Sequence, residues 1–114
     1  MMYEYRIFES VYDDMVSGKK TIEFRLWNDK TKAMNIHDKI KFNVVDSDKY
    51  IIAEILDKFL YDDLDDLWSH KEILTNTLNY TKEEFKEAFY NIFGKETVCN
   101  SKIVGIKIKV LEHN

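Results

Sequence analysis

Apolar and polar side chains alternate along several short stretches of this sequence, as they do in β-strands that bury one face. In TIEFRL, residues 21–26, the apolar side chains fall on one face of a strand, and a hydroxyl, an acid and a base fall on the other. The same alternation predicts strands at residues 2–8, 39–44, 50–56 and 104–110. The apolar faces suit a core, whereas the polar face of residues 21–26 suits either solvent or a binding cleft.

Between the first two strands the spacing changes to that of a helix. Val11 and Met15 stand four residues apart and form an apolar pair on one helical face. Ser10 is a predicted N-cap, with Asp13 in the position that completes a capping box. We expect Gly18 to end this helix, because glycine adopts positive φ without strain.

Two more helices are predicted in the second half of the chain. The first is indicated by helical spacing of Leu60, Leu64, Leu67 and Trp68. The second begins at Thr81, where Glu84 completes a capping box, and ends at Gly94. Its predicted buried stripe consists of Phe85, Phe89, Ile92 and Phe93. Residues 27–35 are polar and are expected to form a loop.

These elements predict an α+β fold with the order β-α-β-β-β-α-α-β, in one domain spanning residues 1–114. Parallel strands need long crossover connections, and most connections here are too short for a doubly wound sheet. We therefore expect a small mixed sheet curled into a barrel, with helices packed on its outside.

Charge and composition narrow the function classes. The formal net charge is −4, which does not favour an extended polynucleotide partner unless a basic surface is local. Cys99 is the only cysteine, which excludes an internal disulfide, and the three histidines are too scattered for a zinc motif. No apolar run is long enough to cross a membrane, and the N-terminus lacks a signal-peptide pattern. A cytoplasmic protein with no metal, no other cofactor and no membrane partner is expected.

The acidic run DDLDDL, residues 62–67, carries four aspartates. It can be interpreted as a metal site, as a contact face for another protein, or as a solvated helix face. The solvated face is the simplest of these. The run would also repel phosphate, which restricts where RNA can lie.

GKKTIEFR, residues 18–25, resembles the G-x-K-x-x-E-x-R signature of the ASCH family in the PUA-like superfamily. VYDDMVSG before it is similar to the family's first helix, IHDKIKF to its GD-x-I-x-F strand, and KIVGIKIKVLE to its last strand. The resemblance implies a PUA-like pseudo-barrel whose motif strand lines a cleft under the first helix. It also implies binding of RNA or modified bases.

One branch of this superfamily, the YqfB-like enzymes, also resembles the chain and hydrolyses N4-acetylcytidine with a lysine, a threonine and a glutamate. By this resemblance the lysine corresponds to Lys20, the threonine position to Glu23, and the glutamate to the region of Leu78 and Asn79. His37 stands where the family usually has glycine.

Lys20, Glu23 and Arg25 are the leading site candidates. A lysine beside a carboxylate in a cleft can bind phosphate or have its pKa tuned toward base chemistry. Glu23 can accept the exocyclic amine of a base, and Arg25 can hold a phosphate or a carbonyl with its fork of donors. The competing interpretations are an exposed turn lysine and a structural ion pair.

Lys19 and Trp27 are further ligand-binding candidates. Lys19 is alternatively an exposed turn lysine, and Trp27, which can stack on a base, is alternatively a tryptophan at the barrel rim. Thr21 can act as a nucleophile only with a base beside it, so a strand hydroxyl is the simpler interpretation. Tyr3 and Tyr5 share a strand face and are expected in the core or at the rim.

The sequence supports three functional hypotheses. The first is a module that binds a nucleoside, a nucleotide or short RNA in a cleft on residues 21–26. The second is an amidohydrolase that acts on an acylated nucleoside, with Lys20 and Glu23 as its catalytic groups. The third is a protein-interaction module that uses the acidic helix. The identity of the ligand and the oligomeric state stay open.

Overall fold

The computed structural model describes residues 1–70 and 80–114. Its strands are β1 (Met2–Ile7), β2 (Ile22–Leu26), β3 (Lys39–Val44), β4 (Tyr50–Tyr61) and β5 (Ile103–His113). The helices of the described residues are α1 (Glu9–Val16), α2 (Asp29–Ala33), α3 (Leu64–Trp68), α5 (Lys82–Phe93) and α6 (Lys95–Cys99).

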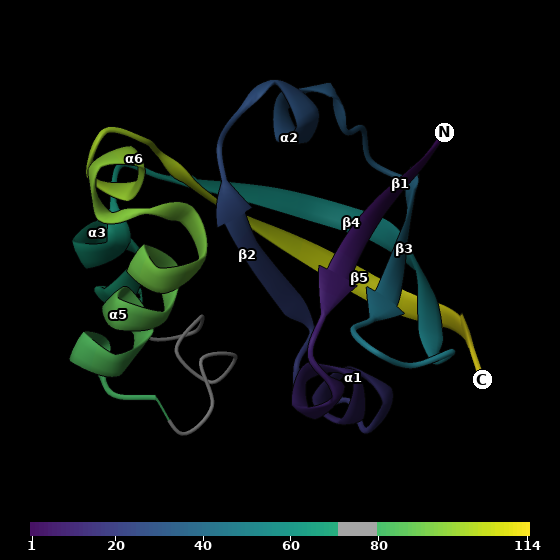
Figure 1. Ribbon diagram of the computed structural model, residues 1–114. Coiled ribbons are helices and arrows are strands. Elements are labelled where there is room, and N and C mark those ends of the chain that lie inside the picture. Colours follow the sequence, from purple (N-terminus) through teal and green to yellow (C-terminus); the bar gives the residue numbers. More distant parts are fainter. Residues whose placement is uncertain (71–79) are drawn as a thin grey trace.

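The five strands form one mixed sheet in the order β1-β3-β4-β5-β2. β1 and β3 are parallel, and the other neighbouring pairs are antiparallel. β4 and β5 are the long central strands and extend behind the shorter ones (Figure 1). The sheet curls into a half-barrel, so its edge strands approach each other: Arg25 Nη2 on β2 donates to the carbonyl oxygen of Arg6 on β1 over 3.4 Å. The α+β fold with a small mixed sheet that the sequence predicted is confirmed.

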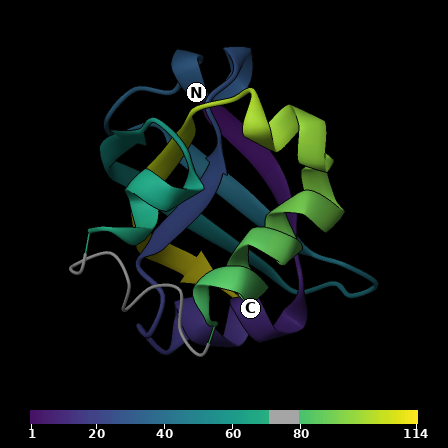
Figure 2. The same ribbon diagram turned by 90° about the vertical axis from the view of Figure 1, so that its left-hand side faces the viewer.

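The helices occupy three places around this sheet. α3, α5 and α6 gather beyond β2, α1 lies at one end of the half-barrel, and α2 lies at the opposite end (Figure 1). Viewed from the side of β2, the three clustered helices lie in front of the sheet (Figure 2). β2 is therefore covered on its apolar face, although it is an edge strand.

Two apolar clusters hold these parts together. One fills the concave side of the sheet and includes Met15 of α1 with Ile40, Phe42 and Ile55 of the central strands. The other joins the apolar face of β2 to the helices beyond it, and its members include Ile22, Phe24, Leu26, Leu64, Leu67, Phe85, Phe89 and Val98. Burial of Ile22, Phe24 and Leu26 against these helices anchors the apolar face of β2.

Several sequence-based boundaries were wrong. Residues 27–35 contain the short helix α2, because Asn28 and Thr31 form a reciprocal capping box that the polar composition did not reveal. β4 continues to Tyr61, so Leu60 belongs to a strand and not to a helix; the following helix begins only at Leu64. β5 extends beyond the predicted 104–110, and α6 was not predicted.

The helix ends were predicted with mixed success. Thr81 and Glu84 do form the capping box of α5, and Gly94 follows its last residue with φ of 88°. Ser10, in contrast, lies inside α1, whose N-cap is Phe8 and has no side-chain capping hydrogen bond. The predicted stripe of α5 is buried at Phe85 and Phe89 but not at Ile92, which is 61% exposed.

Candidate functional site

The turn between α1 and β2 positions the site. Gly18 has φ of 82°, a conformation that glycine adopts without strain, and its N–H bonds to the carbonyl oxygen of Met15. The N–H of Lys20 then bonds back to the carbonyl oxygen of Asp14 over 3.0 Å. This closure directs the chain into β2 directly beside the end of α1. The expectation that Gly18 ends the helix is confirmed.

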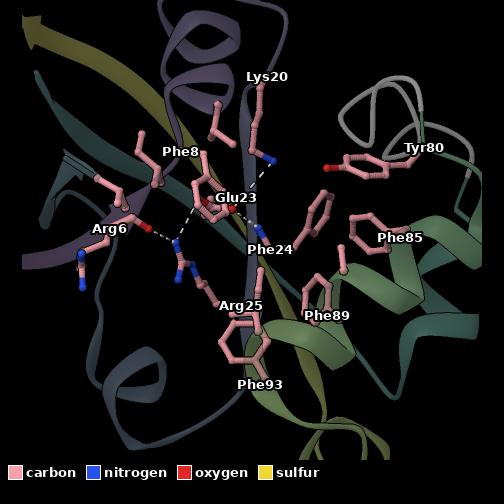
Figure 3. A pocket seen from close by; sticks show the side chains of 15 residues that line it. Arg6, Phe8, Lys20, Glu23, Phe24, Arg25, Tyr80, Phe85, Phe89 and Phe93 are labelled. Atoms are coloured by element: carbon pink, nitrogen blue, oxygen red, sulfur yellow. Dashed lines mark hydrogen bonds and ion pairs between the residues drawn. The ribbon is translucent and has the colours of Figure 1, made fainter. Parts of the chain in front are cut away.

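A pocket of about 460 Å³ lies where β2, the end of β1, α1 and α5 meet (Figure 3). Lys20, Glu23 and Arg25 supply its polar side. Most of the remaining wall is apolar and is formed by Ile7, Phe8, Val11, Phe24, Val45, Tyr80, Phe85, Ala88, Phe89, Ile92 and Phe93. The alternation of β2 thus presents an acid and a base to a concave surface, as the cleft interpretation required.

Lys20 extends into this pocket from the turn that precedes β2. Its Nζ atom donates to the carbonyl oxygen of Ile22 over 2.7 Å, lies 3.8 Å from Oε1 of Glu23, and lies 5.0 Å from the centre of the Phe24 ring. Burial lowers the pKa of the Lys20 amine, because the ammonium loses hydration. The Glu23 carboxylate opposes this shift, and the Arg25 charge adds to it. Lys20 is therefore a buried cation and not an exposed turn lysine.

Glu23 is 7% exposed and is one of the two buried polar residues of the described chain. Its Oε1 atom accepts a hydrogen bond from the backbone N–H of Phe24 over 3.0 Å. Its Oε2 atom pairs with Nη2 of Arg25 over 3.4 Å. One carboxylate thus lies between two cations, Lys20 and Arg25.

Arg25 links the pocket to the face of β1. Its guanidinium carbon lies 4.0 Å from the centre of the Tyr5 ring, and Lys30 Nζ lies 3.9 Å from the same centre. Burial raises the pKa of the Tyr5 hydroxyl. Within the part of the chain that the structure describes, Nε of Arg25 is buried without a hydrogen-bond partner. Buried unpaired donors are rare in folded proteins, and a functional role is one explanation for them.

The other two candidates do not join this group. Lys19 is exposed and does not line the pocket. Trp27 packs against the concave cluster, with Lys58 Nζ 5.2 Å from its ring centre, and also lies outside the pocket. Thr21 is exposed at the start of β2. Leu78 and Asn79 lie outside the described residues.

The apolar wall contributed by α5 was missed as part of the site. The spacing of Phe85 and Phe89 was correctly interpreted as buried, but a helix face can contact both a core and a pocket. The signal available in the sequence was the length of the stripe, which continues at i+7 to Ile92. In the structure Ile92 is exposed and lines the pocket. Phe8 and Tyr80, also exposed at the margin, had no sequence signal that we recognised.

The acidic run does not gather a metal-ligand set. Asp63 caps α3 by accepting from the N–H of Asp66, and Asp65 pairs with Lys82 Nζ of α5 over 2.8 Å. Across residues 1–70 and 80–114, no group of three or more His, Cys, Asp or Glu side chains is placed to hold a metal. In the same residues, no helix is long and apolar enough to cross a membrane.

No protein-family model and no curated protein matches the sequence. Solved structures do match. The hypothetical protein PH0355 has a TM-score of 0.82 at 23% identity, over 97% of this chain and 100% of its own. PF0455 from Pyrococcus furiosus has a TM-score of 0.75 at 24% identity, over 98% and 99% of the two chains. ASCH from Zymomonas mobilis has a TM-score of 0.67 at 16% identity, over 95% of this chain and 66% of its own.

The chain has the fold of an ASCH domain. The fold implied by GKKTIEFR is thereby confirmed, and the ASCH signature maps onto the α1–β2 turn and the polar side of the pocket. At these identities the likeness concerns the fold, so the function rests on the pocket's own chemistry.

Proposed function

We propose that this ASCH-fold chain binds the base of a nucleoside, a nucleotide or a short RNA in the pocket on β2. The observation that carries the proposal is the buried set of Lys20, Glu23 and Arg25 on one side of a pocket of about 460 Å³. This volume falls within the range of small-molecule sites, which combine apolar walls with a few convergent polar groups.

The polar groups suit the edge of a nucleobase. Glu23 can accept a hydrogen bond from an exocyclic amine, as acids do with cytosine N4. Lys20 and Arg25 can donate to a ring carbonyl or to a phosphate. The aromatic side chains of α5 offer apolar surface to the base.

The energetics of the buried charges support a ligand role. A buried ion pair is a weak stabilising device, because desolvation offsets its Coulomb attraction. Lys20 and Glu23 each keep only 10% of their side-chain surface exposed. Retaining two buried cations around one acid costs stability that a ligand function explains better than folding does.

Net charge favours a small ligand over a long one. The chain carries a formal charge of −4, whereas proteins that hold long nucleic acid usually neutralise many phosphates with a basic surface. The ASCH fold supports a link to RNA through its PUA-like relatives. A nucleotide or a short RNA satisfies both considerations.

Calorimetric titration with cytidine 5′-monophosphate tests this proposal. Glu23→Gln keeps the side-chain shape and removes the anionic acceptor, so it should weaken binding by about 1–3 kcal/mol. Lys109→Ala, which removes an exposed lysine on β5, is the control and should bind like the wild type. Equal affinities of wild type and Glu23→Gln, or no binding by the wild type to any of the four ribonucleotides, would contradict the proposal.

A second candidate is hydrolysis of an acylated nucleoside such as N4-acetylcytidine. The observation in its favour is the Lys20 amine 3.8 Å from the Glu23 carboxylate, with its pKa lowered by burial, because a lowered pKa makes an amine a better participant in proton transfer. Water would attack the amide carbonyl, and cytidine and acetate would leave. Glu23 replaces the threonine of the YqfB-like enzymes and would act as the base for this water.

Incubation of the purified protein with N4-acetylcytidine separates the two candidates. If the chain is an enzyme, cytidine is released, Lys20→Met abolishes the release, and Glu23→Gln slows turnover by about 10²–10⁴. If the chain only binds, no cytidine forms above the buffer rate, while titration still shows affinity.

A further inference from the structure

We infer that Phe8 is a ligand-contacting residue that stacks on the bound base at the mouth of the pocket. The inference rests on the proposed nucleobase-binding function and adds an aromatic contact from the α1 side. It starts from the N-cap of α1, where Phe8 stands in place of the polar residues that helices prefer at this position.

Phe8 occupies the N-cap of α1. Its backbone is extended, with φ of −80° and ψ of 159°, and its carbonyl oxygen accepts from the N–H groups of Val11 and Tyr12. A phenylalanine side chain cannot accept a hydrogen bond from the first turn, and α1 has no side-chain cap. Ser, Thr, Asp and Asn are strongly preferred at this position, so Phe8 gives up stability there.

Packing does not explain this choice. Phe8 is 63% exposed, although large apolar side chains usually gain stability by being buried. It belongs to neither apolar cluster and to none of the aromatic pairs found among the described residues. The Phe8 side chain therefore contributes little to the stability of the fold, and a small polar residue could replace it without loss of packing.

The position of Phe8 supplies the explanation. Its side chain lines the same pocket as Glu23 (Figure 3). Tyr80 and Ile92 line the same pocket, and they are 51% and 61% exposed. Three of the exposed large apolar side chains thus line one pocket, whose polar groups are supplied by Lys20, Glu23 and Arg25.

A base held by Glu23 would meet Phe8 as an aromatic surface. Stacking of a base on an aromatic side chain tolerates any base, because every base has a π-face. Local rules of folding are most often broken at functional sites. Phe8 is an unfavourable N-cap residue, and stacking on a bound base would compensate for the stability lost there.

The test uses three variants at this position and cytidine 5′-monophosphate as the probe. Phe8→Ser supplies the missing cap and should lower the unfolding equilibrium constant about fivefold, measured by urea unfolding. The same variant should weaken nucleotide binding about tenfold or more. Phe8→Leu keeps an apolar side chain without a π-face and should also lose affinity, whereas Phe8→Tyr should retain it.

A spectroscopic readout reports stacking directly. In Phe8→Trp the added indole should be quenched when the nucleotide binds, beyond any change seen from Trp27 and Trp68 in the wild type. Sedimentation of each variant shows whether Phe8 instead mediates contact between copies of the chain.

The outcomes separate this inference from the proposed function. If Phe8→Ser keeps full affinity while Glu23→Gln loses it, Phe8 does not contact the base and only the inference fails. A change in oligomeric state without a change in affinity also overturns it. If the wild type binds no nucleotide, the proposed function and the inference fail together.

Discussion

Nζ of Lys20 lies 3.8 Å from Oε1 of Glu23, and each of the two side chains has only 10% of its surface exposed to solvent. The pair is not isolated, because Arg25 takes the other oxygen of the same carboxylate. Burial lowers the pKa of Lys20 although Glu23 attracts the proton, so desolvation is the stronger of the two effects. The ammonium form is thus held in the pocket at a cost to stability.

This cost predicts how stability changes with alkaline pH. The pKa of Lys20 is lower in the folded state than in the unfolded chain, where it has its ordinary value near 10.5. Between these two values the unfolded chain binds more protons, so the free energy of unfolding should rise with pH in this window. Below the folded-state pKa both states are protonated, and Lys20 contributes no slope.

Lys20→Met should remove this rise. Urea unfolding of wild type and variant from pH 7 to 10.5 gives two curves whose difference isolates Lys20 from the other titrating groups. We expect the wild type to gain stability relative to the variant as pH increases. A difference that is flat, or that decreases with pH, would show that Lys20 titrates normally in the folded protein.

The stripe on α5 makes a second prediction, in which a buried and an exposed residue are compared. Phe89 is 6% exposed and packs against Phe85 and Phe93, with ring centres 5.1 and 5.4 Å away. Phe89→Ala should therefore cost about 3–5 kcal/mol of unfolding free energy. Ile92→Ala, at 61% exposure, should change it by less than about 0.5 kcal/mol.

Denaturant unfolding of the two variants checks this contrast. A small loss for Phe89→Ala would mean that α5 is not anchored by its aromatic stripe. A large loss for Ile92→Ala would mean that this side chain is covered, for example by another copy of the chain.

Much of the fold could be predicted because local signals and tertiary packing agree. The alternation in residues 39–44 and the capping box at Thr81 each identified an element correctly, and Gly18 marked the end of α1. The wrong element boundaries came where one residue fits both a helical and a strand pattern. Leu60 fits a helical spacing with Leu64, yet pairing with Val104 on β5 keeps it in a strand.

The candidate site could be predicted only from one side. Lys20, Glu23 and Arg25 are close in sequence, so strand geometry alone brings them together. The opposite wall comes from Phe8, Tyr80 and α5, and no local rule places residues 80–93 beside β2. Long-range packing decides that contact. Lys19 was included as the neighbour of Lys20, but it is exposed and lies outside the pocket. Trp27 was included because its ring can stack on a base, but it follows the last residue of β2 and packs against the concave cluster.

His37 provides a third prediction about backbone conformation. Its φ is 76°, in the left-handed region where a Cβ atom is disfavoured, and the resembling family usually has glycine there. Its Nδ1 atom lies 2.8 Å from Glu54 Oε2, but the side chain is 78% exposed, so this contact adds little. His37→Gly should be more stable than His37→Ala by about 1 kcal/mol, because both lose the ring and only alanine keeps the strain.

Glu87 provides the matched comparison for His37. It is exposed in the middle of α5, where alanine should be more stable than glycine by about 1 kcal/mol. Thermal or urea unfolding of the four variants measures both differences. The same sign at both positions would contradict the left-handed conformation of His37.

The last prediction concerns the length of the ligand. Because the chain has a formal charge of −4 and its acidic run lies at the start of α3, added nucleotides beyond the pocket meet no large excess of positive charge. Binding of a long single-stranded RNA should be weak near physiological salt and should fall further between 50 and 200 mM salt, because any affinity that it gains outside the pocket comes from phosphate contacts, which salt weakens. Binding of cytidine 5′-monophosphate should depend on salt much less, because its affinity comes from Glu23, from the apolar wall and from one phosphate at most.

Fluorescence anisotropy with a labelled 20-nucleotide RNA, alongside calorimetry with the mononucleotide, measures how both affinities change with salt concentration. Tight binding of the long RNA at about 150 mM salt, with little dependence of the affinity on salt, would contradict this prediction. It would show that the protein binds an extended RNA and that the pocket is only one part of its binding surface.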